Sequence, residues 1–427
     1  MGISELTYEK LREAVAGGAY AFRAVVDLEP AGGDGDKVFP PTYEGSVYAY
    51  EDRIIDGETV RCVLLDSVQS QANRLELALL DWHRSCEDGE PPFPLVQIDF
   101  HGTPAEEVGI LTALEAPHRI ADAFFTACEI EEGGTVKRFR HPKKLENSSS
   151  IGLLVDKASS ANATGLFGLC PTALIFGMWD SHGARGGLGE KFQRILTSEI
   201  IGIGATSENR RPTSRIDPLI KVAGESLPIE VKEDGTWKLS DTKGEGKKTK
   251  KFSEIGLGNV TPSLNDKKTN KPNHGGTSIR YARQIAVLSL PALRRLRFPL
   301  DSENPIAQQE EVNVAARTTL AALALAALAR QWEYGFSLRS RCDLVPRGEP
   351  SLSLLQYGIE EKFNLPFERA ADILKNAVIE AKEKGLPWPT QGIDGPWSNG
   401  ILVLRPSEEL VKAVVRSREL AAEQKNE

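Results

Sequence analysis

The stretch between residues 177 and 219 holds the residue types that could bind a phosphate group. A strand is predicted over 172–179, a glycine-rich segment (HGARGGLG) spans 182–189, and a helix is predicted over 190–203. Glycines let backbone N–H groups approach an anion closely, and a helix N-terminus adds a favourable dipole. The pattern therefore predicts a phosphate site, to which these residues contribute: His182, Arg185, Gly186, Gly187, Lys191 and Arg194.

The glycine-rich segment does not match the two common nucleotide-binding motifs. A Walker loop needs Gly-Lys-Ser/Thr, but Gly189 is followed by Glu190, Lys191 and Phe192. The glycine spacing also misses the Gly-x-Gly-x-x-Gly pattern of dinucleotide folds. The remaining alternatives are an ordinary glycine-rich turn and a site for the backbone of a polyanion.

Charge is unevenly distributed along the chain. The 427 residues carry a formal net charge of −8, yet residues 135–297 contain 28 Lys and Arg against 15 Asp and Glu. A basic segment inside an acidic protein is typical of a polyanion-binding surface. The alternative is a set of solvated lysine-rich loops that contact nothing.

Neither export nor a membrane span is predicted. The N-terminal sequence MGISELTYEKLREAV is charged, and the most apolar run, 318–329, is too short to cross a bilayer, which predicts a buried helix. Five scattered cysteines fit reduced thiols, and six scattered histidines show no pair at metal-ligand spacing. We therefore expect a cytoplasmic protein with no membrane contact, no cofactor and no metal.

Hydrophobic periodicity predicts an α+β protein. Residues 67–84 form a helix with one buried face, because apolar positions recur at steps of four and three residues. Strands are predicted over 19–28, 59–65, 95–100 and 279–288, and helices over 312–334, 367–384 and 408–423. This order is compatible with an RRM-like (ferredoxin-like) βαββαβ sheet that carries insertions.

Two passages resemble a known family. They are LLDSVQSQANRLE at 64–76 and FGMWDSHGARGGLG at 176–189, the latter followed by SRIDP at 214–218. Together they resemble the Csb-type RAMP protein of type I-G (formerly I-U) CRISPR systems, which is the Cas-seven-group backbone subunit of a Cascade effector. The resemblance extends over most of the chain and is less clear beyond Gly348.

The resemblance implies an RRM-like palm with finger and thumb insertions. We expect one elaborated domain over 1–427, a finger-like insertion at 29–60, a thumb-like basic insertion at 205–278 and a helical C-terminal extension at 349–427. It further implies a non-enzymatic protein with no catalytic residues, several copies of which bind one CRISPR RNA. Its partners would be that RNA, target DNA reached through the guide, further copies of itself and other Cascade subunits.

Further residues could contact nucleic acid in such a subunit. One flank of the helix at 67–84 presents Ser67, Ser70, Gln71 and Arg74, whereas Gln69 and Asn73 fall on the other flank. Hydroxyls, amides and a guanidinium bind phosphate, 2′-OH and base edges without demanding one sequence. Arg210, Arg211 and Arg215 could hold a neighbouring phosphate, although a structural ion pair with Asp217 is the alternative for Arg215. These lysines could face DNA: Lys247, Lys248, Lys250, Lys251, Lys267 and Lys268.

Two other functions stay open at this level. RAMP relatives include endoribonucleases that process CRISPR RNA with a histidine, which would give His182 a catalytic role. A metabolic enzyme could instead use the glycine-rich segment to bind the phosphate of a small nucleotide. The missing Walker pair and the diffuse basic segment count against the second alternative.

Overall fold

The computed structural model describes most of the chain. The residues outside the description are 1–2, 87–91, 142, 181–190, 207–228, 233–235, 240–254, 256, 258–264, 266–273, 301–305, 389–396, 399 and 425–427. The described part is a mixed α+β fold built around two sheets. The larger sheet has strand order β1-β18-β17-β2-β14-β11-β4-β3, and β15 and β16 lie off this path.

The centre of the larger sheet has ferredoxin-like topology. In chain order its elements are β2 (Ala21–Pro30), α2 (Val68–Ser85), β11 (Leu196–Ile203), β14 (Tyr281–Ser289), α8 (Ile306–Tyr334) and β17 (Ser351–Gln356). The strands lie in the order β17-β2-β14-β11, and each neighbouring pair is antiparallel. This βαββαβ arrangement confirms the predicted RRM-like palm. We call this sheet the palm sheet.

Other elements extend the palm sheet. A hairpin of β3 (Tyr50–Ile55) and β4 (Glu58–Asp66) is inserted before α2 and pairs with β11; β3 lies inside the range 29–60 that was predicted to be finger-like, whereas most of β4 lies beyond it. At the other end, β18 (Ile359–Asn364) pairs with β17 and with the short β1 (Ser4–Glu5). The hairpin of β15 (Phe336–Arg339) and β16 (Cys342–Pro346) pairs with the end of β2.

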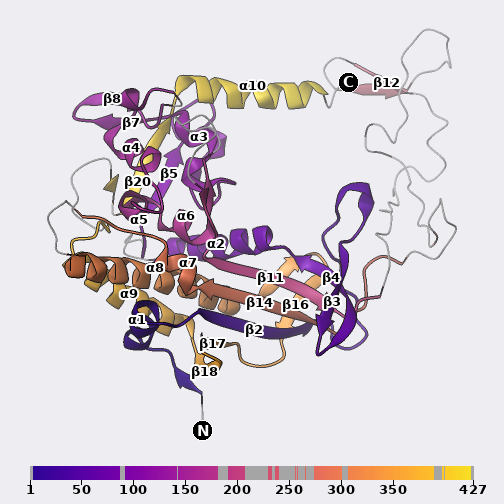
Figure 1. Cartoon of the computed structure of the whole chain (residues 1–427). Helices are drawn as coiled ribbons and strands as arrows, with labels where there is room; N and C mark the ends of the chain where they lie inside the picture. Colours follow the sequence, from indigo (N-terminus) through magenta and orange to yellow (C-terminus); the bar gives the residue numbers. More distant parts are fainter. Residues whose placement is uncertain are drawn as a thin grey trace.

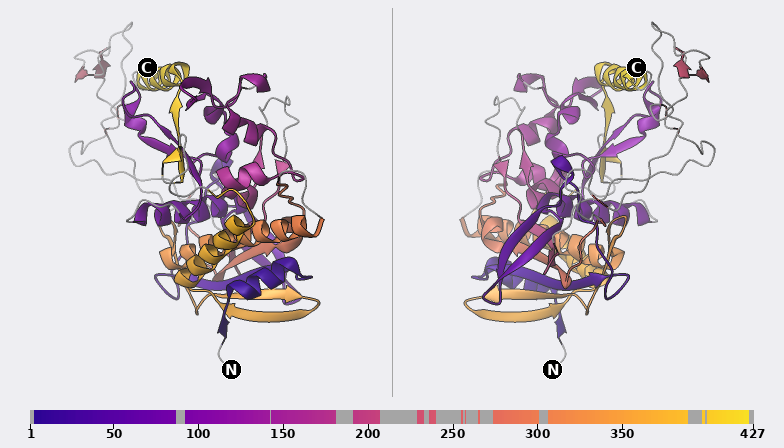
Figure 2. Two further views of the ribbon diagram at one scale, coloured as in Figure 1. Left: turned by 90° about the vertical axis from the view of Figure 1, so that its left-hand side faces the viewer. Right: turned by 90° about the vertical axis from the view of Figure 1, so that its right-hand side faces the viewer.

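Helices cover one face of the palm sheet. Strand β14 alternates between buried and half-buried residues, and its buried side chains face α2 and α8. Helices α1 (Tyr8–Ala16) and α9 (Phe367–Glu383) lie close to α8 (Figures 1 and 2). By length and composition α8 could cross a membrane, but its apolar stretch is wholly buried, as in the core helix predicted from the sequence.

A second, smaller sheet lies above the palm sheet in Figure 1. Its order is β6 (Ile110–Thr112), β5 (Leu95–Asp99), β20 (Ile401–Pro406), β7 (Cys128–Glu132) and β8 (Thr135–Arg138), and β19 (Trp397–Ser398) pairs with β20. Around it lie α3 (Ala123–Thr126), α4 (Ser150–Asp156), α5 (Thr164–Leu169) and α10 (Glu408–Gln424). One hydrophobic cluster includes Phe22 of the palm and Leu404 of the second sheet, so the two sheets share a core.

The predicted C-terminal and thumb-like ranges contain strands. Residues 349–427 hold α9 and α10 and also supply β17, β18 and β20, so both sheets depend on this range. Within 205–278 the structure describes a small hairpin of β12 (Ile229–Val231) and β13 (Trp237–Leu239). The short helix α7 (Leu290–Arg294) follows β14.

Two predictions beside the glycine-rich segment are wrong. Residues 172–179 were expected to form a strand, but α6 (Pro171–Phe176) occupies most of this range and only β9 (Met178–Trp179) is extended. Pro171 lies in the first turn of α6, where its missing N–H costs nothing. Because every residue of α6 is buried, its sequence shows no helical periodicity.

Residues 190–203 were expected to form a helix, but they contain β10 (Lys191–Phe192) and β11. Phe192, Ile195, Leu196 and Ile200 happen to follow a helical spacing. Pairing along the whole of β11 with β14 overrides that local pattern. No helix dipole is therefore available just after the glycine-rich segment, and this part of the phosphate argument does not hold.

Candidate nucleic-acid interface

Only some predicted site residues lie in the described part of the chain. Ser67, Ser70, Gln71, Arg74, Lys191 and Arg194 are described. The others lie outside the described residues: His182, Arg185, Gly186, Gly187, Arg210, Arg211, Arg215, Lys247, Lys248, Lys250, Lys251, Lys267 and Lys268.

The predicted flank of α2 is directed at the buried carboxylate of Asp66. Ser67 caps the helix by accepting a hydrogen bond from the Ser70 backbone N–H. The Ser70 hydroxyl donates to Asp66 at 2.7 Å, and the Arg74 Nε donates to the same carboxylate at 2.9 Å. Arg74 also donates to the carbonyls of residues 337 and 338 in β15. These side chains join α2 to its neighbouring strands.

The prediction that Gln71 contacts RNA is wrong, because Gln71 has no exposed surface. Its amide donates to Asp66 at 2.6 Å, and its carbonyl oxygen accepts from Ser198 at 2.8 Å and from Gln284 at 3.1 Å. Gln331 joins the same network from α8, where it accepts from Gln284 at 2.9 Å. Buried amides that satisfy one another in this way fix the position of α2 and α8 on the palm sheet.

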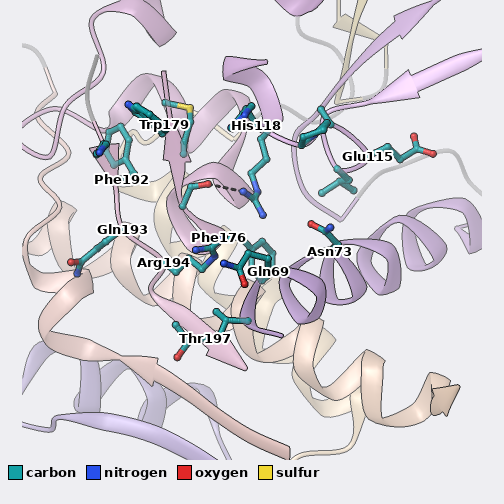
Figure 3. Close-up of a pocket in the computed structure, with 18 of the residues that line it drawn as sticks. Gln69, Asn73, Glu115, His118, Phe176, Trp179, Phe192, Gln193, Arg194 and Thr197 are labelled. Atoms are coloured by element: carbon teal, nitrogen blue, oxygen red, sulfur yellow. Dashed lines mark hydrogen bonds between the residues drawn. The ribbon is translucent and has the colours of Figure 1, made fainter. Parts of the chain in front are cut away.

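The opposite flank of α2 forms one wall of an open cleft of about 980 Å³, which we call the α2 cleft. Gln69 and Asn73, four residues apart and both exposed, project from α2 towards Thr197 of β11 and towards Arg194, which lies in the connection between β10 and β11 (Figure 3). The remaining wall comes from residues 114–119, 176–179 and 191–193. The strands β9 and β10, which flank the glycine-rich segment, therefore border this cleft.

Arg119 holds three parts of the cleft together. Its guanidinium donates to both carboxylate oxygens of Glu76 on α2, at 2.6 and 2.7 Å, and to the carbonyl of Gly177 at 2.8 Å. Arg119 and Glu76 are 5% and 1% exposed, so the pair is buried. Burial raises the pKa of Glu76 to about 7, although the charges of Arg119 and Arg194 act in the opposite direction.

Arg194 lines the cleft without a carboxylate or carbonyl partner among the described residues. Its Nε–H is buried and donates to no hydrogen-bond acceptor in the described part of the chain, although the residue as a whole is half-buried. Burial lowers the pKa of Arg194, and the nearby charge of Arg119 lowers it further. A desolvated cation of this kind is stabilised by any anion that enters the cleft.

An exposed aromatic residue lies beside a second cation at the edge of the cleft. Trp179 and Lys191 are cross-strand neighbours in the β9–β10 pair, and the Lys191 ammonium lies 4.5 Å from the centroid of the indole ring. Trp179 is 45% exposed, whereas a strand-ending Trp is more often part of a core. Lys191 forms no ion pair within the described part of the chain.

Asp180, at the end of β9, is held by a buried arginine from outside the palm sheet. Asp180 accepts from the Arg140 guanidinium at 2.5 Å, and Asp156 of α4 accepts from the same guanidinium at 2.6 Å. Arg140 is 1% exposed. This buried triad fixes the end of β9 relative to α4.

The open face of the palm sheet differs from the cleft in its electrostatics. Arg283 of β14 pairs with Asp27 of the neighbouring β2 at 2.6 Å, and Arg53 of β3 reaches across β4 to pair with Glu199 of β11 at 2.5 Å. Arg23 and Arg347 also pair, with Glu360 and Glu29. Because these four arginines are matched by carboxylates, they give this face no excess of positive charge for an RNA backbone. Lys191 and Arg194, which have no ion-pair partner among the described residues, lie in the cleft instead.

The described residues contain no group of three or more His, Cys, Asp and Glu side chains placed to hold a metal ion. His118 lies in the cleft wall, next to Arg119. The sequence did not predict that Gln69, Asn73, His118 and the Glu76–Arg119 pair belong to one site. The four-residue spacing of Gln69 and Asn73 is the sequence feature that indicates a shared helix face.

Residues 23–207 match the model of a family described as CRISPR-associated protein GSU0053. This stretch is similar to a CRISPR-associated protein. The match begins in β2, ends just after β11 and contains every residue that lines the α2 cleft. It leaves out β14, α8 and the C-terminal part of the palm sheet. No curated protein matches the chain.

The CRISPR-associated similarity is thus concentrated on the part of the fold that forms the cleft. The α2 cleft lies wholly inside the stretch that is similar to a CRISPR-associated protein, which makes it the candidate site.

Proposed function

We propose that this protein is the RNA-binding backbone subunit of a type I CRISPR effector, the type I-G Cascade. Several copies would line up along one CRISPR RNA, together with other Cascade subunits in the cytoplasm, and present the guide to target DNA. The observation that carries the proposal is the location of the α2 cleft, with its unmatched cations, inside the stretch that matches a CRISPR-associated family.

The side chains in the cleft suit a single-stranded RNA. Lys191 and Arg194 supply charge for phosphates, Trp179 supplies an aromatic surface, and Gln69 and Asn73 supply amides. Proteins that bind single strands without sequence preference combine cations along the backbone with aromatic platforms for the bases. Amides can bond the 2′-OH and base edges. Sequence specificity would then come from base pairing between guide and target.

The proposed subunit has no catalytic function. A nuclease test must cover two histidines. His118 lines the cleft, and His182 belongs to the glycine-rich segment, which lies outside the described residues. Purified protein is incubated with repeat RNA and the products are separated by gel. Intact RNA is expected, and cleavage that His118→Ala or His182→Ala abolishes would replace the proposal with an endoribonuclease.

The backbone role is tested by expression with and without a CRISPR array. The purified particle is analysed by its 260/280 nm absorbance ratio and its mass. A large, RNase-sensitive particle with guide-length RNA is expected only when the array is present. A nucleic-acid-free monomer in both cultures, with partner subunits co-expressed, would overturn the proposal.

A charge-reversed variant connects this experiment to the site. Arg185→Glu combined with Lys191→Glu should abolish RNA co-purification, because Lys191 lies in the cleft and Arg185 lies in the glycine-rich segment that β9 and β10 flank. Lys375→Glu, at an exposed position of α9, is the matched control. An unchanged RNA content in the double variant would show that the cleft does not bind the RNA.

A further inference from the structure

We propose that the α2 cleft is a single-nucleotide subsite, in which Arg194 binds one phosphate of the RNA and Trp179 stacks on one base. The base would be unstacked from one of its neighbours in the RNA. This inference rests on the proposed RNA-binding function and assigns separate tasks to two residues of that site.

The phosphate assignment follows from the charge balance at the base of the cleft. Glu76, Arg119 and Arg194 form a cluster with one negative and two positive charges when all three are ionised. Both oxygens of Glu76 are already taken by Arg119. Arg194 therefore keeps an uncompensated charge, and its buried Nε has an unused donor. A phosphodiester supplies one negative charge and acceptor oxygens in the geometry that a guanidinium binds best.

The position of Arg194 is fixed by the backbone around it. A Cβ atom built on Gly177 would lie 3.2 Å from both Cγ and the backbone nitrogen of Arg194, so the two segments are in close contact. Gly177 in turn accepts a hydrogen bond from Arg119. The backbone and the first carbon atoms of the Arg194 side chain are thus held in place, which lowers the conformational entropy that the guanidinium loses when it binds a ligand.

The base assignment follows from the exposure and partner of Trp179. With the Lys191 ammonium over one face and 45% of the residue exposed, the indole keeps open ring surface that a base can cover. Lys191 adds a positive charge beside that surface. A base in a duplex has both faces stacked, so this contact selects single-stranded RNA with an interrupted stack.

The amides on α2 complete the subsite. Gln69 and Asn73 lie one helical turn apart on the exposed side of α2, and both line the same cleft as Thr197 of β11 (Figure 3). A side-chain amide both donates and accepts, so it can bond the ribose 2′-OH or any base edge. The subsite would therefore hold a nucleotide without reading its identity, as a guide-binding protein requires.

The test measures RNA affinity at several salt concentrations. Fluorescence anisotropy with labelled single-stranded RNA of guide length is recorded for the full-length protein and the variants Arg194→Met and Trp179→Leu. Arg194→Met should weaken binding about 10-fold and lower the slope of log K against log salt by about 0.7, the value for one lost phosphate contact. Trp179→Leu should also weaken binding about 10-fold, within the range for one stacked base, but leave the slope unchanged.

Matched variants separate function from folding. Lys375→Met on α9 and Tyr334→Leu at the exposed end of α8 remove a cation and an aromatic ring outside the cleft, and neither should change the affinity or the slope. Trp179→Phe keeps an aromatic ring and should restore most of the affinity lost in Trp179→Leu. Arg194→Lys keeps the charge and should restore the salt slope more than the affinity.

The outcomes distinguish this inference from the function on which it rests. If the wild type fails to bind RNA with partner subunits present, the proposed function falls and the subsite falls with it. If the wild type binds but both cleft variants bind equally well, the subsite is overturned and the RNA-binding function stands. Equal slopes for wild type and Arg194→Met would overturn the phosphate assignment alone.

Discussion

Arg119 shows how one residue can position an entire site. It lies in the left-handed region at φ +54, which is uncommon for a residue with a side chain. In that conformation its guanidinium reaches Glu76 on α2 and the carbonyl of Gly177 before β9. The backbone strain is accepted because three buried hydrogen bonds depend on it. The cleft therefore keeps its shape through one buried cation.

Removing this cation should destabilise the protein markedly. Arg119→Met leaves the Glu76 carboxylate and the Gly177 carbonyl buried without their partner, and we expect the free energy of unfolding to fall by about 3 kcal/mol. Arg53→Met breaks the half-exposed pair with Glu199 and should cost less than about 1 kcal/mol. Chemical denaturation at pH 7.5 compares the two, and equal losses would contradict this role of Arg119.

The same substitution should change the pH dependence of stability. The folded-state pKa of Glu76, about 7, lies above its usual 4.5. The contribution of Glu76 to the free energy of unfolding is therefore fully present below pH 4.5 and is lost as the pH rises through 7. Without Arg119 the pKa rises further, because the largest opposing charge is gone. The deficit of Arg119→Met should therefore be greater at pH 8 than at pH 5. A deficit independent of pH would contradict this account.

Gly177 depends on having no side chain. Its φ is +84, and a Cβ would lie 2.9 Å from the Phe192 carbonyl oxygen. Gly177→Ala should lower the free energy of unfolding by about 1–3 kcal/mol more than Gly33→Ala. Gly33 is a close match at φ +81 but has nothing within 4 Å of its Cβ position. Equal effects in thermal and chemical unfolding would show that backbone conformation, and not the contact with β10, sets the cost.

At the scale of elements, α4 is held at its N-terminus by a carboxylate from β7. Glu132 accepts from the backbone N–H of Ser150 at 3.0 Å and of Ile151 at 3.3 Å. Burial alone would raise the pKa of Glu132, but these hydrogen bonds and Lys137 lower it. A lowered pKa contributes stability above pH 4.5 that is lost as the pH falls through the folded-state value.

Glu132→Gln should therefore remove part of the acid sensitivity. The variant is expected to lose about 1 kcal/mol of unfolding free energy at pH 7, as for a lost helix cap, and much less at pH 3. Urea denaturation at both pH values measures the difference. Glu129→Gln, on the same strand, is the control. A loss of equal size at both pH values would show that the charge of Glu132 does not contribute.

How well sequence predicted the elements depended on their length and periodicity. The helix expected at 67–84 is α2, because four turns of amphipathic pattern follow a Ser67 cap, and the strand expected at 279–288 is β14. The predictions for residues 172–179 and 190–203 were wrong, because their apolar runs fit a helix or a strand equally well. Tertiary packing around Gly177 and pairing with β14 decided them.

The candidate site was predictable only where local sequence carries the signal. Lys191 and Arg194 were selected as cations near the glycine-rich segment, and both line the α2 cleft. Gln71 was assigned to the wrong environment, because helical stepping gives a flank but not the network that buries it. The Glu76–Arg119 pair joins residues 43 positions apart, a separation at which a single sequence gives no signal.

At the scale of the whole molecule, the net charge does not indicate whether the protein can bind RNA. The protein is acidic at −8, yet the cations of the palm face are matched by carboxylates while Lys191 and Arg194 in the cleft are not. An RNA backbone responds to the local field and not to the total charge.

If copies line up along a guide, RNA length must set the size of the particle. Head-to-tail association uses two different surfaces and does not close on itself, so the ligand limits it. Arrays with spacers of two lengths should give particles whose masses differ by whole multiples of the 46.7 kDa chain plus the added RNA. Native mass spectrometry measures this, with the Arg194→Met and Trp179→Leu double variant expected to yield fewer loaded particles. A particle mass independent of spacer length would mean that protein contacts alone fix the copy number, and the cleft would then bind RNA without organising the assembly.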